Sequence, residues 1–138
     1  MKVKCKIDNL NSSQLSLETL GRLKQYISRT DGELDLEIGK EYVVYGIELW
    51  DNCPWLYICR DNYEKYPVPV AADFFEITDK RLSAHWQLNF KEVSNSDNQT
   101  QLVFPEWANS ELFYEDLISG DKHTEIVFEK YRKIMDTE

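Results

Sequence analysis

Two runs of strand-forming residues, separated by a polar turn, constrain the fold of this chain most. The first run covers residues 40–50, contains the segment YVVYGIELW and ends at Asp51-Asn52. The second run, WLYIC at residues 55–59, ends at the polar residues 60–62. β-branched and aromatic side chains favour strands, whereas Asp and Asn favour turns. The two runs therefore predict an antiparallel hairpin closed by polar loops.

Alternating polar and apolar residues predict further strands on both sides of this hairpin. Residues 2–8 alternate charged side chains with Val3, Cys5 and Ile7, and residues 34–38 alternate in the same way before Gly39. A period of two places one side of a strand in the core. Other short strands are expected at residues 66–70, 74–78, 85–90 and 102–104. Two prolines make the segment 66–70 an edge strand or an extended crossing segment, because proline cannot donate to a β-ladder.

Helical patterns occur near both ends of the chain. A helix over residues 12–28 is expected, capped by Ser12 or Ser13. Near the C-terminus we expect a short helix from residues 109–110 to 117, closed by Gly120, and a final helix from residue 121 or 124. The very polar residues 91–101 are expected to form a loop or a hairpin tip. Strands followed by helices predict an α+β fold.

The length of 138 residues is typical of one domain. We predict a single domain over residues 1–138, with a β-rich core at about 1–8 and 34–104 and a helical part at about 108–136. Because 42% of the residues are hydrophobic and 13% are aromatic, an intrinsically disordered chain is excluded.

The formal net charge of −9 restricts the partners of the protein. A non-specific nucleic-acid binder needs basic residues to displace counterions, and a protein that binds an anionic membrane surface needs them as well. We therefore expect no direct nucleic-acid partner and a basic protein partner. The first residues do not form a secretory signal and no run is apolar enough to span a membrane, so a cytoplasmic protein is expected.

The sequence offers little catalytic chemistry. It contains no phosphate-binding glycine motif, no HExxH and no GxSxG, and its only histidines are His85 and His123. Cys5, Cys53 and Cys59 lack the spacing of a zinc site and are expected to be free thiols. Acidic pairs are frequent, as chance alone would produce among 25 acids. We therefore predict a protein without catalytic residues, cofactor or metal.

Binding chemistry is better represented, because acidic and aromatic residues alternate between residues 48 and 73. Aromatic side chains supply rigid contact area, and carboxylates bind arginine and lysine. Trp55 and Tyr57 lie on a predicted strand and are expected in the core. The predicted partner-binding residues are Glu48, Trp50, Asp51, Asp61, Tyr63, Glu64 and Asp73.

Two local patterns resemble known families. The segment VKC at residues 3–5, followed by LEIGKEYVV at residues 36–44, resembles the opening of small SH3-like β-barrel domains of bacterial and phage proteins. The resemblance implies an SH3-like antiparallel barrel or strongly curved sheet, with an inserted helix near the N-terminus and two C-terminal helices. In that arrangement Gly39 forms a tight turn, and Tyr42 and Val44 enter the barrel.

The remaining sequence, from WLYICRDN through PVPVAADFFEITDKRLSAHW to FPEWANSELFYEDLISGD, resembles uncharacterised bacterial immunity proteins of polymorphic-toxin systems. The resemblance implies a protein that binds and neutralises a cognate toxin, which in many such systems is a basic nuclease. It transfers no catalytic residues.

Two other functional classes remain open. One is an SH3-like adaptor or regulatory module that binds a peptide or protein partner. The other is a small enzyme that uses a cluster of acids. An inhibitor of a basic toxin requires the acids near residues 48–73 and 106–121 to gather on one face of the molecule.

Overall fold

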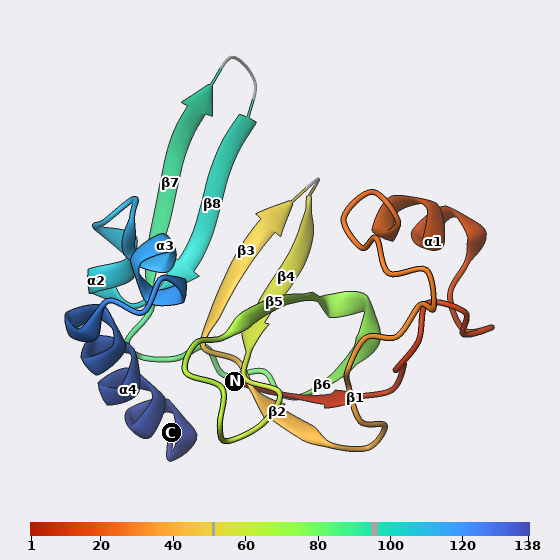
Figure 1. Ribbon diagram of the computed structural model, residues 1–138, viewed down its shortest axis with the longest axis horizontal. Coiled ribbons are helices and arrows are strands. Elements are labelled where there is room, and N and C mark those ends of the chain that lie inside the picture. The colour runs from red at the N-terminus through yellow and green to blue at the C-terminus, as the bar shows by residue number, and fades with distance from the viewer. Residues whose placement is uncertain (51, 95–96) are drawn as a thin grey trace.

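The computed structural model describes residues 1–50, 52–94 and 97–138. Within these ranges, antiparallel strands form a three-stranded and a five-stranded sheet, with helices packed around them (Figure 1). The three-stranded sheet has the order β2 (Glu41–Val43), β1 (Lys2–Cys5) and β6 (Phe75–Asp79). The five-stranded sheet has the order β5 (Val68–Ala71), β4 (Cys53–Ile58), β3 (Gly46–Trp50), β8 (Asp97–Val103) and β7 (Gln87–Ser94). The predicted α+β class is confirmed.

Two chain segments pass from one sheet to the other. Residues 41–50 contain β2 and β3, and Tyr45 between them donates its N–H to Tyr57 O at 2.8 Å. Residues 68–79 contain β5 and β6, which are joined by the 3-10 helix η1 (Ala72–Phe74). The described strands do not close into a barrel, so the SH3-like barrel is not confirmed.

The predicted central hairpin is present as β3 and β4, in which Trp55 and Tyr57 are buried as expected. The strand β5, which contains Pro69, lies at the edge of its sheet, in agreement with the edge alternative. In β1, Val3 and Cys5 are buried and Lys4 between them is exposed, which confirms the alternation there.

The N-terminal helix differs from the prediction in its start and its length. It is α1 (Leu17–Leu23), capped by Ser16, whose Oγ accepts a hydrogen bond from Thr19 N at 3.1 Å. Ser12 does not cap the helix, because its Oγ accepts from Gln14 N in a preceding turn. The helix ends at the fully buried Leu23.

The alternating residues 34–38 do not form a strand, contrary to the prediction. Asp35 has a φ of 57°, in the left-handed region, which breaks the extended backbone that a ladder needs. Its carboxylate instead accepts from Arg29 Nη1 at 2.7 Å. Gly39 has a φ of 84° and forms the expected turn before β2, and Tyr42 and Val44 are buried.

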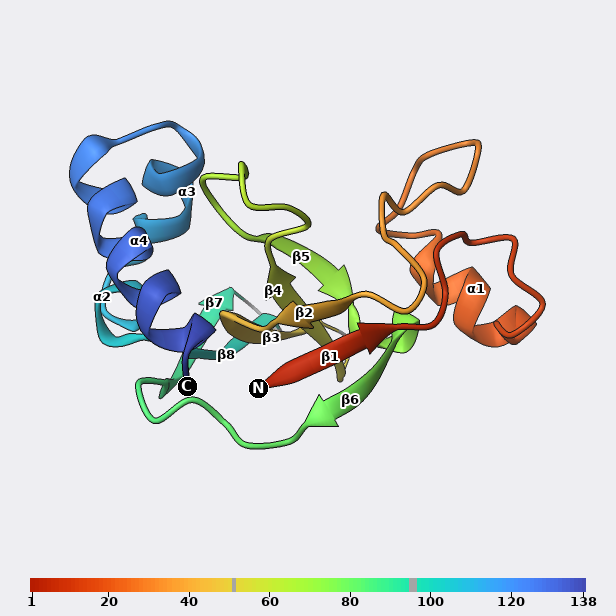
Figure 2. The ribbon, with the colours of Figure 1, turned by 90° about the horizontal axis from the view of Figure 1, so that it is seen from below.

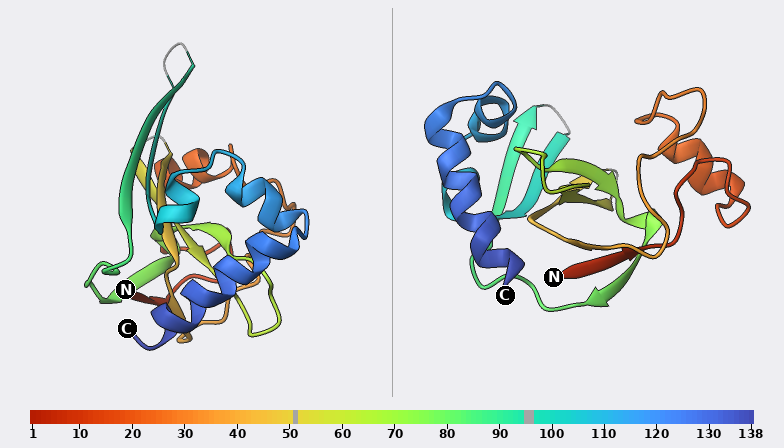
Figure 3. Two further views of the ribbon diagram at one scale, coloured as in Figure 1. Left: turned by 90° about the vertical axis from the view of Figure 1, so that its left-hand side faces the viewer. Right: turned by 60° about the horizontal axis from the view of Figure 1, so that its bottom comes forward.

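Of the polar stretch 91–101, residues 91–94 and 97–101 are paired strand, which agrees with the hairpin alternative and not with a plain loop. They form the outer halves of β7 and β8, a hairpin that projects beyond the rest of the molecule (Figure 3, left). A hairpin arm exposed to water tolerates polar side chains on both faces, so its hydrophobic signal is weak. Leu88 and Phe90 share one face of β7 and are 69% and 61% exposed.

The C-terminal part contains three α-helices among the described residues, not two. They are α2 (Pro105–Ala108), α3 (Phe113–Ile118) and α4 (Lys122–Asp136). Pro105 starts α2, because its fixed φ suits the first turn of a helix. Gly120, with a φ of 85°, follows α3 as predicted, and Asp121 caps α4.

Two clusters of buried side chains stabilise this arrangement. The first lies between the two sheets and α1, and the second lies between the five-stranded sheet and α2–α4. The helix α1 therefore lies at one end of the molecule and α2–α4 lie at the other end (Figure 2). Trp86 packs against both clusters and donates its indole N–H to Tyr45 O at 3.0 Å.

Candidate functional site

The face of the five-stranded sheet that carries Glu48 forms a row of polar side chains. In the strand register, Glu48 of β3 lies opposite Gln101 of β8, and Gln101 lies opposite Asn89 of β7. Directly opposed residues of antiparallel strands point to the same face of a sheet. The polar row therefore runs across three strands, on the side where the central hairpin meets α2 and α3.

A hollow of about 290 Å³ lies over this row. We call it the Glu48 hollow. The strands β3, β7 and β8 contribute six side chains to its lining: Glu48, Trp50, Asn89, Lys91, Gln99 and Gln101. The residues around α2 and α3 line the opposite side, among them Trp107, Glu111, Tyr114 and Glu115.

Glu48 is a buried carboxylate whose hydrogen bonds come from neutral groups. The residue is only 7% exposed. Its Oε2 accepts a hydrogen bond from Tyr57 Oη at 2.5 Å, and its Oε1 accepts one from Gln99 Nε2 at 3.2 Å. Over the described ranges, Glu48 forms no ion pair with Lys, Arg or His. Burial raises the pKa of Tyr57, and the negative charge of Glu48 and its hydrogen bond raise it further, so the phenol stays a donor.

An aromatic wall holds Tyr57 in place. The rings of Trp107 and Tyr114 are stacked with their centroids 5.6 Å apart, and both meet Tyr57 edge to face. Tyr114 Oη donates to Pro67 O at 2.8 Å, which fixes α3 against the chain that leads into β5. The Tyr57 hydroxyl is therefore directed at Glu48 by packing on several elements.

The Glu48 hollow brings together acids that are far apart in the sequence. Glu48 comes from the group near residues 48–73, whereas Glu111 and Glu115 come from the group near 106–121. Lys91 also lines the hollow, and its Nζ lies 3.6 Å from Glu111 Oε1. Three carboxylates and one ammonium thus surround this space. Of the acids near residues 48–73, the hollow contains Glu48 alone, so the two acidic groups meet here only in part.

Trp50 is the other predicted residue that lines this hollow. Its ring packs against Trp55, with centroids 4.6 Å apart, and against Tyr26, 5.7 Å apart. Asp51 was predicted beside Trp50 and lies outside the described residues.

Asp61, Tyr63 and Glu64 lie on the loop that follows β4, away from Glu48 in the sheet. The Asp61 carboxylate accepts from the backbone N–H groups of Tyr63 and Glu64, and Glu64 pairs with Arg60 at 2.7 Å. Both carboxylates thus have partners within the protein. Tyr63 is 92% exposed.

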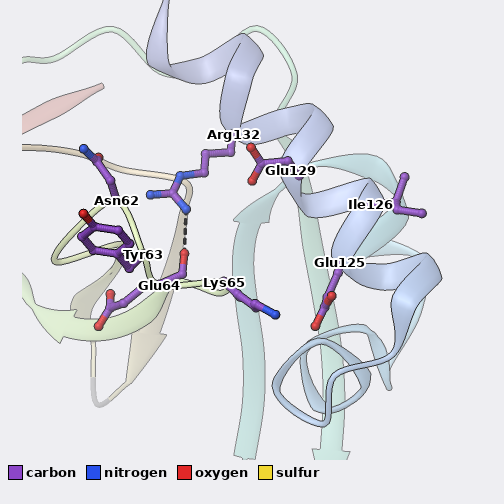
Figure 4. A pocket seen from close by; sticks show the side chains of 8 residues that line it. All are labelled: Asn62, Tyr63, Glu64, Lys65, Glu125, Ile126, Glu129 and Arg132. Carbon is purple, nitrogen blue, oxygen red and sulfur yellow. Dashed lines mark hydrogen bonds between the residues drawn. The ribbon is translucent and has the colours of Figure 1, made fainter.

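A second hollow, of about 310 Å³, lies between this loop and α4, and we call it the Arg132 hollow. Arg132 of α4 donates from Nη1 to Glu64 O at 2.6 Å (Figure 4) and from Nη2 to Asp61 O at 3.1 Å. Tyr63, Glu125 and Glu129 are among the other lining residues. The guanidinium of Arg132 holds the loop against the helix.

Asp73 lies apart from both hollows. It belongs to η1, and its Oδ1 accepts from Arg22 Nη2 of α1 at 2.7 Å. Both side chains are partly buried, so this ion pair ties α1 to the sheets. The structure therefore groups Glu48 with Trp50, groups Asp61 with Tyr63 and Glu64, and separates Asp73.

Several residues of the Glu48 hollow were missed from the sequence. Gln99 and Gln101 fell in a stretch expected to be a loop or a hairpin tip, and Asn89 was not singled out. The period-two spacing of Gln99, Gln101 and Val103 was the available signal for a strand there. Trp107 and Tyr114 reach the hollow only through the docking of α2 and α3.

The described residues contain little conventional catalytic apparatus. Within the described ranges, no three His, Cys, Asp or Glu side chains are grouped so that they could hold a metal ion. His85 and His123 are exposed. The three cysteines are free, and burial raises the pKa of the Cys59 thiol to about 12, which disfavours the nucleophilic thiolate.

No helix in the described parts of the chain has both the length and the apolarity to cross a membrane.

Comparison with known proteins gives no relative. No protein-family model matches this sequence, and neither a curated protein nor a solved structure matches it significantly.

Proposed function

We propose that this chain is a non-catalytic immunity protein that binds and neutralises a basic, nuclease-like bacterial toxin domain in the cytoplasm. The observation that carries the proposal is the Glu48 hollow, where a buried carboxylate that no described residue pairs with as an ion is flanked by Glu111 and Glu115. Buried charges in proteins are normally paired, so this arrangement favours a cationic partner. The net charge of −9 also favours a cationic partner, because it attracts positive charge over longer distances.

The two curved sheets also support an SH3-like core as part of this proposal. Residues 41–50 and 68–79 each contribute strands to both sheets, and β1 pairs with β2 on one side and with β6 on the other. Such sharing of bent segments is what a small, strongly curved barrel requires. The α1 insertion, the β7–β8 hairpin and the helices α2–α4 would then be additions to that core.

The test is binding to the basic toxin domain encoded beside this gene. We expect a pull-down at low salt to recover that domain, with an association rate that falls steeply as salt increases, because opposite charges steer the encounter. Replacing Glu48, Glu111 and Glu115 together by glutamine should weaken binding by at least about tenfold, or about 1.4 kcal/mol.

The matched control carries the same change in net charge elsewhere. Glu18, Glu37 and Glu76 are exposed and lie outside the lining of the hollow. Their joint replacement by glutamine should change the affinity by less than about threefold, within the range of an exposed charge effect. Failure to recover any toxin domain at low salt would refute the proposed function.

A second candidate function is a peptide-binding SH3-like module. The aromatic cluster of Tyr26, Trp50 and Trp55 favours it, because Tyr26 is partly exposed and meets Trp55 edge to face at 5.4 Å. Binding of short peptides that quenches tryptophan fluorescence and disappears in Tyr26→Ala would support this function. The same titration without any quenching would exclude it.

A further inference from the structure

The Glu48 hollow contains hydrogen-bond acceptors that the described residues leave partly unfilled. Each carboxylate oxygen of Glu48 accepts one hydrogen bond from described residues, although a carboxylate has about four acceptor positions. Asn89 and Gln99 use their amide nitrogens, which donate to Gln101 Oε1 at 3.0 Å and to Glu48 Oε1. Their amide oxygens accept no hydrogen bond from the described part of the chain. Glu48, Asn89 and Gln99 therefore present acceptor oxygens with unfilled positions to one space.

Among the described residues, no cation pairs with Glu48. Tyr57 and Gln99 are neutral donors that stabilise its carboxylate by hydrogen bonds, and a nearby cation would further offset the cost of burying the charge. Lys91 is the cation that lines the hollow, but its ammonium pairs with Glu111. Neighbouring Glu115 adds a further negative charge. The hollow thus favours a positively charged group that brings several donors.

Size and shape restrict that group further. About 290 Å³ lies at the lower limit of the roughly 300–1,000 Å³ of sites for drug-sized ligands, so the space suits one side chain. The rings of Tyr57, Trp107 and Tyr114 line one side of the hollow. Trp107 is stacked on Tyr114 and on Phe113, and Tyr57 and Trp107 are buried, so Tyr114 is the most exposed ring of this wall. A guanidinium is planar, stacks on aromatic rings and carries five donors, whereas an ammonium is a strongly hydrated point charge with three donors.

We propose that the Glu48 hollow is a specific binding site for one arginine side chain of the protein partner, with the guanidinium bound to Glu48 and its flat face against the aromatic wall. This inference rests on the proposed function for the identity of the partner. The recognition of arginine by the hollow can be measured without that partner.

The experiment titrates the full-length protein with N-acetyl-argininamide and, separately, with N-acetyl-lysinamide. Binding is followed by the NMR signals of the Asn89 and Gln99 side-chain amides and by tryptophan fluorescence. We expect saturable arginine binding with a dissociation constant on the order of 1 mM, and lysine binding at least about tenfold weaker. Equal affinities for the two probes, or no saturable shift of either amide, would overturn the proposal.

Glu48→Gln provides the decisive variant. It keeps the size of the side chain and removes the charge, so we expect arginine binding to weaken by at least about tenfold. The melting temperature of this variant should equal or exceed that of the unaltered protein, because glutamine removes the desolvation cost of burying the Glu48 charge. Glu76→Gln, a change at an exposed position, is the control. This variant should bind arginine with the same affinity as the unaltered protein. Unchanged arginine binding by Glu48→Gln would contradict the proposal.

A second variant covers the case in which Glu48→Gln does not fold. Gln99→Leu removes an acceptor and the hydrogen bond to Glu48 from a half-buried position, and should weaken arginine binding by about threefold or more. The outcomes also separate the two hypotheses. Arginine binding without toxin binding would refute the immunity function alone, whereas toxin binding that Glu48→Gln leaves intact would refute the arginine site alone.

Discussion

Gly46 shows at the residue scale how the sheet and the helices fit together. It lies opposite Tyr57 in the β3–β4 pair, and a Cβ built on it would approach Val103 Cγ1 to 2.9 Å and Trp107 Cζ3 to 3.5 Å. The absence of a side chain at this position therefore lets Trp107 reach the sheet. The aromatic wall of the Glu48 hollow depends on this close approach.

The two glycines 46 and 21 give a matched pair of substitutions. Gly46→Ala should lower the free energy of unfolding by about 1–3 kcal/mol, because the added methyl group overpacks the contact with Val103. Gly21 lies in α1, and no atom lies within 4 Å of a Cβ added there. Gly21→Ala should therefore raise the free energy of unfolding by about 0.5–1 kcal/mol, because alanine has the higher helix propensity. Denaturant unfolding measures both values. Equal effects of the two substitutions would contradict this packing.

The helix α1 illustrates what determines an element. Leu23, at the end of α1, belongs to the first core cluster, whereas Leu17, at its start, is 88% exposed. A helix of this length is not stable alone, so its docking and its cap decide whether it forms. Arg22 contributes to the docking through its ion pair with Asp73.

The cap of α1 can be identified by comparing serines. Ser16→Ala should lower the free energy of unfolding by about 1 kcal/mol, because the N–H of Thr19 loses its acceptor. Ser13→Ala removes an exposed hydroxyl from the preceding turn and should change it by less than about 0.5 kcal/mol. Urea denaturation of the two variants checks the assignment. A larger loss for Ser13→Ala would place the helix start where the sequence pattern alone had predicted it.

At the scale of the whole molecule, buried tyrosines connect the sheet to the C-terminal helices and set an alkaline limit on stability. Burial is the largest cause that raises the pKa of Tyr45, Tyr57 and Tyr114, and for Tyr45 the hydrogen bond to Asp136 of α4 adds to it. In the unfolded chain a tyrosine ionises near pH 10. The unfolded state therefore loses protons at a lower pH than the folded state does.

The expected consequence is a stability that these tyrosines leave unchanged below about pH 9 and reduce progressively above about pH 10. Unfolding by urea at a series of pH values, together with phenolate absorbance, measures it. The absorbance should rise with unfolding rather than before it. Ionisation of all eight tyrosines near pH 10 in the folded protein would show that none is protected.

Local patterns predicted a large part of the fold. The hairpin of β3 and β4, the edge position of β5 and the glycine after α3 follow from propensity, proline chemistry and turn geometry. The strand predicted at 34–38 fails because Asp35 adopts a left-handed conformation beside Arg29, a contact that alternation does not show. The sequence left residues 91–101 open between a loop and a hairpin tip, because most side chains there are polar and give only a weak strand signal.

The sequence by itself determined the α+β class, the acidity of the protein and the burial of Trp55 and Tyr57, because each depends on composition or on neighbours in the chain. Only the tertiary structure decided which acids act together. Glu48 meets Glu111 and Glu115 because β8 pairs with β3 and α3 docks beside Tyr57, whereas Asp73 turns to α1. Contacts between distant segments arise from packing, and no local pattern encodes which carboxylate remains without a cation.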